Sequence, residues 1–92
     1  MSELPRFPRV LSKRDGMPSG AVYVGRPGRF GNPFVIGRHG DRAAVVARFE
    51  AWLLTNPELV DAAKAELRGK DLVCWCAPEA CHADVLLRIA NV

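Results

Sequence analysis

The chain has 92 residues, of which 49% are hydrophobic and 25% charged, with a formal net charge of +3. This length allows one domain with a two-layer core, and the composition is that of an ordinary globular protein. No apolar run reaches the roughly 18 residues that a membrane span requires, and the N-terminus lacks the apolar core of a signal peptide. These features exclude a membrane-spanning chain and predict a cytoplasmic protein.

The first part of the chain predicts two strands. We expect residues 1–8 to be a flexible N-terminus and residues 9–92 to form a single α/β domain. Arg9–Arg14 is a short candidate for an edge strand, which the turn pair Asp15-Gly16 ends. Ala21–Gly25 contains small, aromatic and β-branched residues and predicts a clearer second strand.

A long loop follows at residues 25–40, because five glycines and two prolines are too many for regular structure. Its arginines suit bidentate contact with an oxyanion, and its asparagine suits amide recognition. Arg26, Arg29 and Asn32 are therefore the candidate ligand-binding residues. In the alternative interpretation, Phe30 and Phe34 fasten the loop to the core, and Asn32 caps a turn.

The charge distribution in this half of the chain is uneven. Four arginines fall within seventeen residues, at positions 26, 29, 38 and 42. Such clustering indicates a surface that faces an anion, although a solvated face is an equally good explanation.

Two helices are predicted after the loop. Asp41 is a candidate N-cap, and apolar residues recur on one helical face from there to about Thr55. Asn56-Pro57-Glu58 starts a second helix, with asparagine as N-cap and proline at the first helical position, and Gly69 ends it.

The last part of the chain holds all three cysteines and one of the two histidines. Leu72–Cys76 is an apolar run without alternation, which predicts the central strand of a sheet. Helical spacing then runs from Cys81 to about Ala90. The element order predicts an α/β fold with a three-stranded, at least partly parallel sheet and three helices. Trp52 and Trp75 are expected in the core, because each lies in an apolar helix face or strand.

The turn between this strand and helix permits three chemistries. In the first, Cys81 or Cys76 is a nucleophile, His82 is an acid or base and Asp84 is a carboxylate, since a helix N-terminus lowers the pKa of a thiol. In the second, Cys76 and Cys81 form a redox dithiol. The third is zinc bound by Cys74, Cys76, Cys81 and His82. The spacing is poor for zinc, because adjacent side chains diverge on a helix. We therefore predict no cofactor and no metal, with zinc as the alternative and Cys74 as a buried strand residue.

Two separated motifs resemble the family catalogued as domain of unknown function 4326, small proteins of bacteria and their phages. The motifs are Tyr23–Pro27 with Phe30–Phe34, and Leu72–Cys76 with Cys81–Leu86. The resemblance covers about Val22 to the C-terminus. It implies that the Gly-Asn-Pro-Phe loop and the Cys-His turn matter together, and it implies no reaction. A looser likeness of that loop to phage-associated N-glycosidases for ADP-ribose-type substrates is an analogy only.

The two candidate segments are expected to meet at one pocket. If the strands ending at Gly25 and Cys76 are parallel neighbours, both lead into these segments at the same edge of the sheet, where ligands of open α/β sheets bind. We therefore predict that Arg26 or Asn32 lies within direct or one-water reach of residues 76–82.

Two functions remain open, and whether the protein is an enzyme stays undecided. The first is a small phage- or bacterial-type protein that binds, and as an enzyme acts on, a nucleotide-like or phosphorylated anionic ligand. The second is a phage-type module that binds a host protein without catalysis, as in host takeover or growth inhibition. Nucleic acid is not an expected partner, because the charge is small and no basic recognition helix appears. A monomer or small homo-oligomer is expected.

Overall fold

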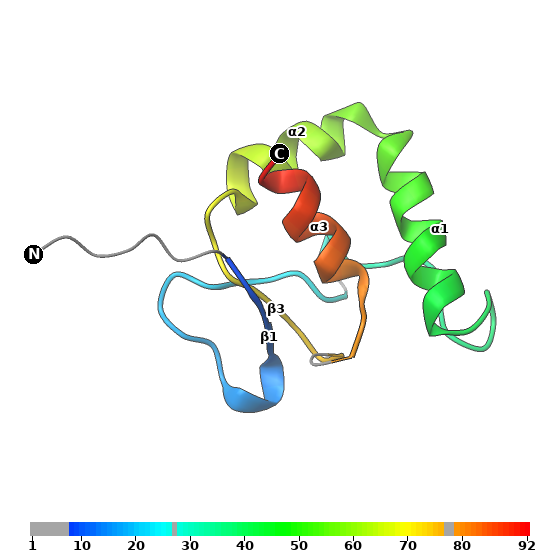
Figure 1. The fold of residues 1–92 in the computed structure, drawn as a ribbon, viewed down its shortest axis with the longest axis horizontal. Helices are drawn as coiled ribbons and strands as arrows, with labels where there is room; N and C mark the ends of the chain where they lie inside the picture. Colours follow the sequence, from blue (N-terminus) through cyan, green and yellow to red (C-terminus); the bar gives the residue numbers. More distant parts are fainter. Residues whose placement is uncertain (1–7, 27, 77–78) are drawn as a thin grey trace, which may run out of the picture.

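The computed structural model describes residues 8–26, 28–76 and 79–92, so the expectation of a flexible N-terminus falls almost entirely outside the described residues. The elements in chain order are β1 (Val10–Ser12), the 3-10 turn η1 (Lys13–Asp15), β2 (Val22–Tyr23), α1 (Arg42–Leu54), α2 (Pro57–Leu67), β3 (Leu72–Cys74) and α3 (His82–Ala90) (Figure 1). The predicted α/β fold, with a three-stranded sheet and three helices, is confirmed.

The sheet has the order β1-β3-β2, and both outer strands run parallel to β3. All three residues of β3 are buried, which confirms the prediction that the apolar run forms the central strand. The pleat directs Leu72 and Cys74 to one face, where they join the main core, and Val73 to the other. β1 is an edge strand, as predicted.

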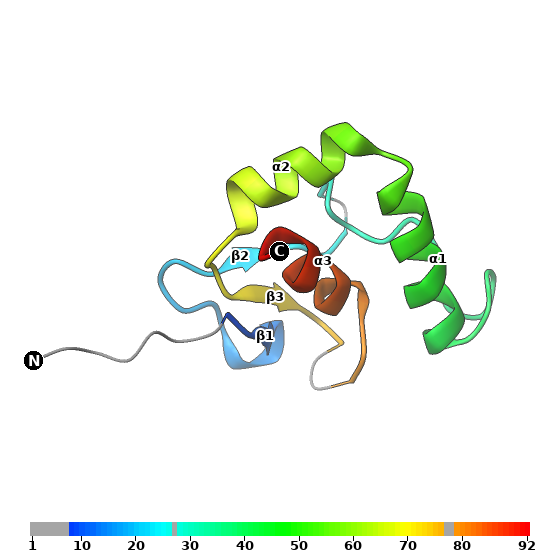
Figure 2. The same ribbon diagram turned by 45° about the horizontal axis from the view of Figure 1, so that its top comes forward.

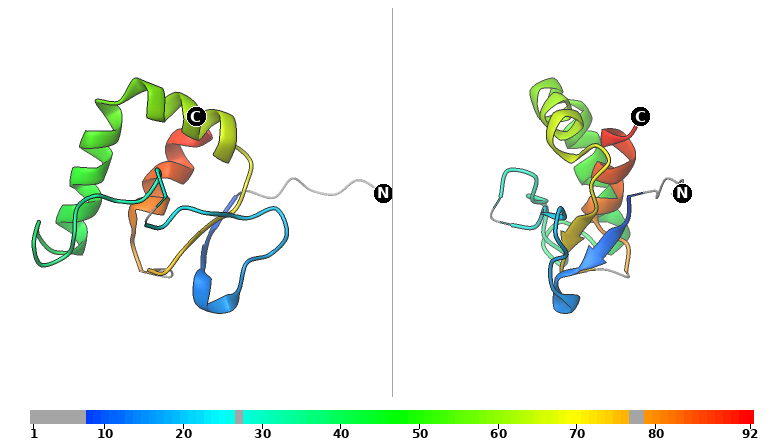
Figure 3. Two further views of the ribbon diagram at one scale, coloured as in Figure 1. Left: turned by 180° about the vertical axis from the view of Figure 1, so that it is seen from behind. Right: turned by 90° about the vertical axis from the view of Figure 1, so that its left-hand side faces the viewer.

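The three helices pack together beside the sheet. α3 contacts β1 and β3 and also packs against α1 and α2. Figures 1 and 2 show α1 and α2 meeting at an angle and enclosing α3, and the views of Figure 3 agree. Because α3 has neighbours on several sides, most of its residues are buried.

The helix ends lie close to where local signals place them. Asp41 accepts a hydrogen bond from the amide of Ala44, as expected of the N-cap of α1. Pro57 is the first residue of α2. Gly69 follows the C-terminus of α2 with φ of +76°, a conformation that glycine adopts without strain.

The prediction that both tryptophans lie in the core is wrong for Trp75, whose exposed fraction is 53%. Trp75 follows the last paired residue of β3, so its side chain lies at the open edge of the sheet. Trp52 is half-buried and packs against Phe49, with ring centroids 5.8 Å apart. No helix in the described part of the chain is both long and apolar enough to cross a membrane.

Candidate functional site

A cavity of about 340 Å³ opens at the carboxyl ends of β2 and β3. Its wall combines the loop after β2, the start of α1 and the turn between β3 and α3. Arg26 and Asn32 line it together with Cys76, Cys81 and His82. The predicted convergence of the loop and the Cys-His turn is therefore confirmed. Parallel pairing of β2 with β3 explains it, since parallel strands deliver their carboxyl ends to the same edge.

Three thiols gather at this edge. The sulfur atoms of Cys74, Cys76 and Cys81 all lie within 4.8 Å of one another. The Sγ atoms of Cys74 and Cys81 are 2.8 Å apart. Cys74 and Cys81 are buried and Cys76 is half-buried. The cluster thus has two inner sulfurs and one nearer to solvent.

The position of Cys81 in its helix explains why its sulfur meets the other two. Cys81 is the N-cap of α3 and has extended backbone, with φ −152° and ψ 173°. Its Sγ accepts a hydrogen bond from the amide of Ala83 at 3.3 Å. Because a residue outside the helical turns is free of helical side-chain directions, its sulfur turns back toward Cys74.

The helix N-terminus does not activate the thiol of Cys81. The hydrogen bond with Cys74 and burial raise the pKa of Cys81, outweighing the amide of Ala83, which lowers it. The direction of this shift is opposite to the one expected of a thiol activated by a helix N-terminus. Cys81 is a buried cysteine here, and a nucleophile would need the thiolate.

His82 is held inside the fold, with 8% of its surface exposed. Its Nε2 lies 2.8 Å from the carbonyl oxygen of Val24. Because a carbonyl oxygen can only accept, Nε2 carries the ring proton, and its N–H donates a hydrogen bond to that oxygen. The ring packs edge-on against Phe49, with centroids 5.0 Å apart. Burial lowers the pKa of His82, opposed in part by the carbonyl groups of Val24 and Phe30. His82 therefore connects the start of α3 to the end of β2 as a neutral ring.

These contacts do not assemble the zinc ligand set considered from the sequence. Among the described histidine, cysteine and acidic residues, the three thiols form a group that His82 does not join. The sulfur of Cys81 meets that of Cys74, whereas Nε2 of His82 meets the carbonyl oxygen of Val24.

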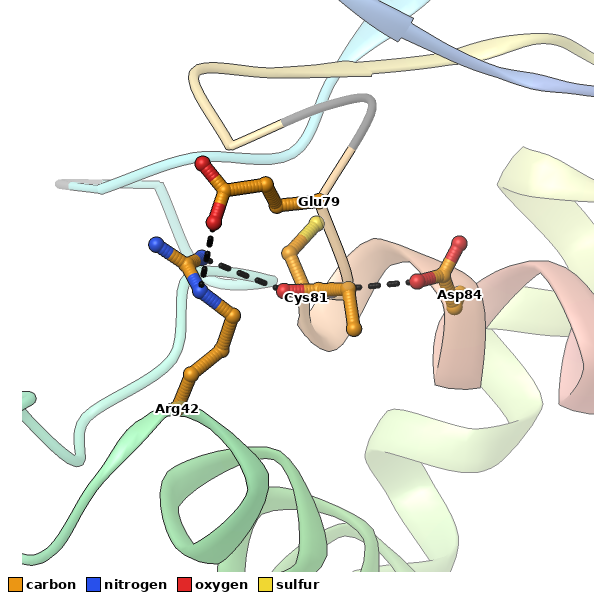
Figure 4. Close-up of polar contacts among 5 residues, drawn as sticks. Arg42, Glu79, Cys81 and Asp84 are labelled. Carbon is orange, nitrogen blue, oxygen red and sulfur yellow. Dashed lines mark hydrogen bonds and ion pairs between the residues drawn. The ribbon is translucent and has the colours of Figure 1, made fainter.

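Asp84 acts on the helix rather than on the cavity. Its Oδ2 accepts a hydrogen bond from the amide of Cys81 at 3.0 Å, which completes a capping box with the sulfur of Cys81 (Figure 4). Asp84 is exposed and does not line the cavity. The structure therefore separates Asp84 from the other residues proposed for catalysis.

The arginines divide between two places. Arg26 lines the cavity, and the missing side chain of Gly31 permits this, since a Cβ there would lie 3.0 Å from the Cα of Arg26. Arg29 lies elsewhere: its guanidinium pairs with Glu66 of α2 and stacks over Phe30 at 5.1 Å. Arg29 is thus not brought into the cavity.

Arg42 is a cavity residue that our choice of candidates omitted. Its Nη1 donates to the carbonyl oxygen of Ala80 at 3.2 Å, and its Nε lies 3.4 Å from Glu79 (Figure 4). The Cys76 side chain, as an acceptor for the Arg42 guanidinium, raises the pKa of Arg42; desolvation opposes this rise, and the nearby charge of Glu79 adds to it. The sequence contained a signal for this residue. Arg42 begins a helix whose first turn has no acidic residue, and a positive charge at that end is unfavourable with the helix dipole.

Asn32 fastens the loop to α1. Its Nδ2 donates to the carbonyl oxygen of Val45 at 3.1 Å, and its Oδ1 accepts from the amide of Phe34 at 2.9 Å. Only 7% of Asn32 is exposed, and Phe30 lies in the core. The interpretation of Asn32 as a turn cap and of Phe30 as an anchor is confirmed, whereas Phe34 is half-buried against His39.

Comparison with known proteins adds a family and no reaction. The model of the domain of unknown function DUF4326 matches residues 10–92. No curated protein and no solved structure matches the chain.

Proposed function

The chain belongs to the DUF4326 family, whose domain has no assigned function, so we propose a function from the geometry of the cavity. The protein binds a phosphorylated anion of the size of one nucleotide at the carboxyl edge of its sheet. One observation carries the proposal: Arg26 and Arg42, which come from different segments, line the same cavity beside an exposed aromatic ring.

The charge of the cavity favours an anion. No carboxylate is among the described residues that line it. Arg42 has Glu79 as an ion-pair partner, but within the described part of the chain Arg26 makes no ion pair. A guanidinium presents paired N–H donors that match a phosphate or carboxylate, so Arg26 supplies the main contact and Arg42 a second.

The aromatic residues favour a flat group attached to that anion. Trp75 is exposed at the cavity and Tyr23 also lines it. Indole and phenol faces stack on nucleobases. A volume of about 340 Å³ lies near the lower end of ligand pockets, which span about 300 to 1,000 Å³, and therefore suits a single nucleotide rather than a dinucleotide.

The proposal concerns binding and assigns no reaction. The residues first considered for catalysis are engaged in the fold: the pKa of the Cys81 thiol is raised, and Nε2 of His82 donates to Val24. Asp84 caps α3. Of the three thiols, only Cys76 is half-buried and adjacent to a cation, Arg42.

Isothermal titration with adenosine monophosphate, inorganic phosphate and adenosine tests the proposal. We expect the nucleotide to bind more tightly than either fragment, because only it uses both the arginines and the aromatic rings. Arg26→Ala should weaken nucleotide binding about tenfold, the loss of one charge-assisted contact. Arg38→Ala is the matched control, an exposed arginine of the same loop that lies outside the cavity.

The proposal fails if none of the three probes binds at about 5 mM, or if Arg26→Ala and Arg38→Ala have the same effect. The first outcome would favour the second candidate, a module that binds another protein. Val35, Ile36 and Trp75 are exposed apolar residues at the cavity and could contact a partner chain. Ile36→Lys should then abolish binding to that partner, while Arg26→Ala leaves it intact.

A further inference from the structure

The cluster of three thiols has a use that anion binding does not require. We propose that Cys74, Cys76 and Cys81 bind one Zn²⁺ ion through their sulfur atoms, leaving a fourth coordination position that faces the cavity. This inference is independent of the proposed nucleotide binding, because it depends on the sulfur atoms and not on the arginine loop.

The distances suit three sulfur ligands on one ion. Zinc–sulfur bonds of about 2.3 Å in tetrahedral geometry place two sulfurs about 3.8 Å apart. The three Sγ atoms lie within 4.8 Å of one another, so the cluster is close to the required size. The Cys74 and Cys81 sulfurs, now 2.8 Å apart, would separate by about 1 Å.

The backbone explains why poor spacing along the chain does not prevent the site. Cys76 lies in the bend that follows β3, two residues after Cys74, and this bend brings its sulfur within 4.8 Å of the other two. Cys81 supplies the third sulfur as the N-cap of α3, not as a residue within the helix. Side chains of adjacent residues diverge where both residues are helical, and Cys81 has extended backbone.

Two neighbouring groups suit bound thiolates rather than thiols. Three thiolates and Zn²⁺ carry a formal charge of −1, and binding releases three thiol protons to solvent. Arg42 lines the same cavity as the three cysteines, and its positive charge would balance that charge. The amide of Ala83 donates to the Cys81 sulfur, a contact typical of the groups that orient metal ligands.

The fourth position remains open because the described residues offer no further ligand there. Among them, no histidine, aspartate or glutamate side chain joins the three cysteines as a fourth member of the group. Nε2 of His82 already donates a hydrogen bond to the carbonyl oxygen of Val24. All three cysteines line the cavity. Three protein ligands with an open position are the pattern of zinc sites that accept water or a substrate atom.

Metal analysis of the reduced full-length chain, expressed with added zinc, tests the inference. We expect about one zinc per chain by mass spectrometry of the metal content. Cys76→Ser should reduce this to near zero, and because Cys76 is half-buried this variant is the one expected to keep its fold, which circular dichroism checks. His82→Gln, which keeps an N–H donor, should retain zinc.

Cobalt substitution provides a second measurement that does not depend on any variant. Co²⁺ in the wild-type chain should give intense visible bands and a sulfur-to-metal charge-transfer band, as expected of tetrahedral thiolate ligation. Zinc well below one per chain in the folded reduced protein would overturn the inference, as would zinc retained by Cys76→Ser. A metal-free chain whose mass is lower by two hydrogens, with Cys74 joined to Cys81, would instead assign the cluster to a disulfide.

Discussion

Two of the three segments that line the cavity use their polar groups differently. In the thiol turn, residues 74–82, the sulfur of Cys81 and the ring of His82 are buried and have partners inside the protein. In the arginine loop, residues 25–40, Arg26 and the apolar Ile36 are exposed. The residue types that suggest catalysis are thus buried in the thiol turn, whereas Arg26, the main contact proposed for the anion, is exposed in the arginine loop.

Asn32 shows that the difference between these two segments is one of burial and not of position in the chain. It belongs to the arginine loop, yet both ends of its amide bond the backbone and it is nearly buried. Substitutions at buried residues of the cavity should therefore change stability, and substitutions at its exposed residues should change binding.

The largest expected effect is on stability, at His82. His82→Ala leaves the carbonyl oxygen of Val24 without its donor and opens a cavity beside Phe49. We expect the free energy of unfolding in urea to fall by about 2 to 4 kcal/mol. His82→Gln keeps an N–H donor and should lose less. A loss of less than about 0.5 kcal/mol for His82→Ala would contradict the structural role of the ring.

Asn32→Ala should have the next largest effect on stability. It removes the acceptor for the amide of Phe34 and the donor for the carbonyl of Val45. Unpaired buried groups of this kind cost about 1 to 3 kcal/mol, measurable by urea unfolding. Arg38→Ala, at an exposed position of the same loop, is the control and should change stability by less than about 0.5 kcal/mol. Equal free energies of unfolding for Asn32→Ala and Arg38→Ala would contradict the prediction that buried loop residues stabilise the fold more than exposed ones.

Arg26→Ala should separate binding from stability. Because Arg26 is exposed, we expect the free energy of unfolding to change by less than about 0.5 kcal/mol, while the affinity for adenosine monophosphate falls about tenfold. Titration calorimetry and urea unfolding on the same preparation check both. Loss of stability and affinity together would place Arg26 with the buried residues.

The smallest effect on nucleotide affinity is expected from Trp75, which is exposed at the cavity. Trp75→Phe keeps an aromatic face, so nucleotide affinity should change by less than about threefold. It should, however, remove most of the fluorescence that iodide quenches readily, because Trp75 is exposed and Trp52 is half-buried. Quenching that stays unchanged in Trp75→Phe would show that Trp52 is the accessible indole.

The sequence by itself determined the elements and the edge at which the site lies. Some signals depend only on residues a few positions away, so a short stretch of sequence is enough to predict their effect. These signals are the cap at Asp41, the stop at Gly69 and the apolar run at residues 72–74. The convergence of the two segments was also predictable, because parallel strands bring their carboxyl ends to one edge.

Only the tertiary structure decided what each side chain at that edge contacts. The donor of His82 meets a carbonyl group 58 residues away, and Arg42 reaches Ala80 across 38 residues. Cys81 changed from a presumed helical nucleophile to an N-cap beside Cys74, and Trp75 from core to rim, through shifts of a residue or two in where an element ends. Local patterns determine which residues are helical or extended. The partner of a buried polar group depends on contacts between segments distant in sequence, which no local pattern contains.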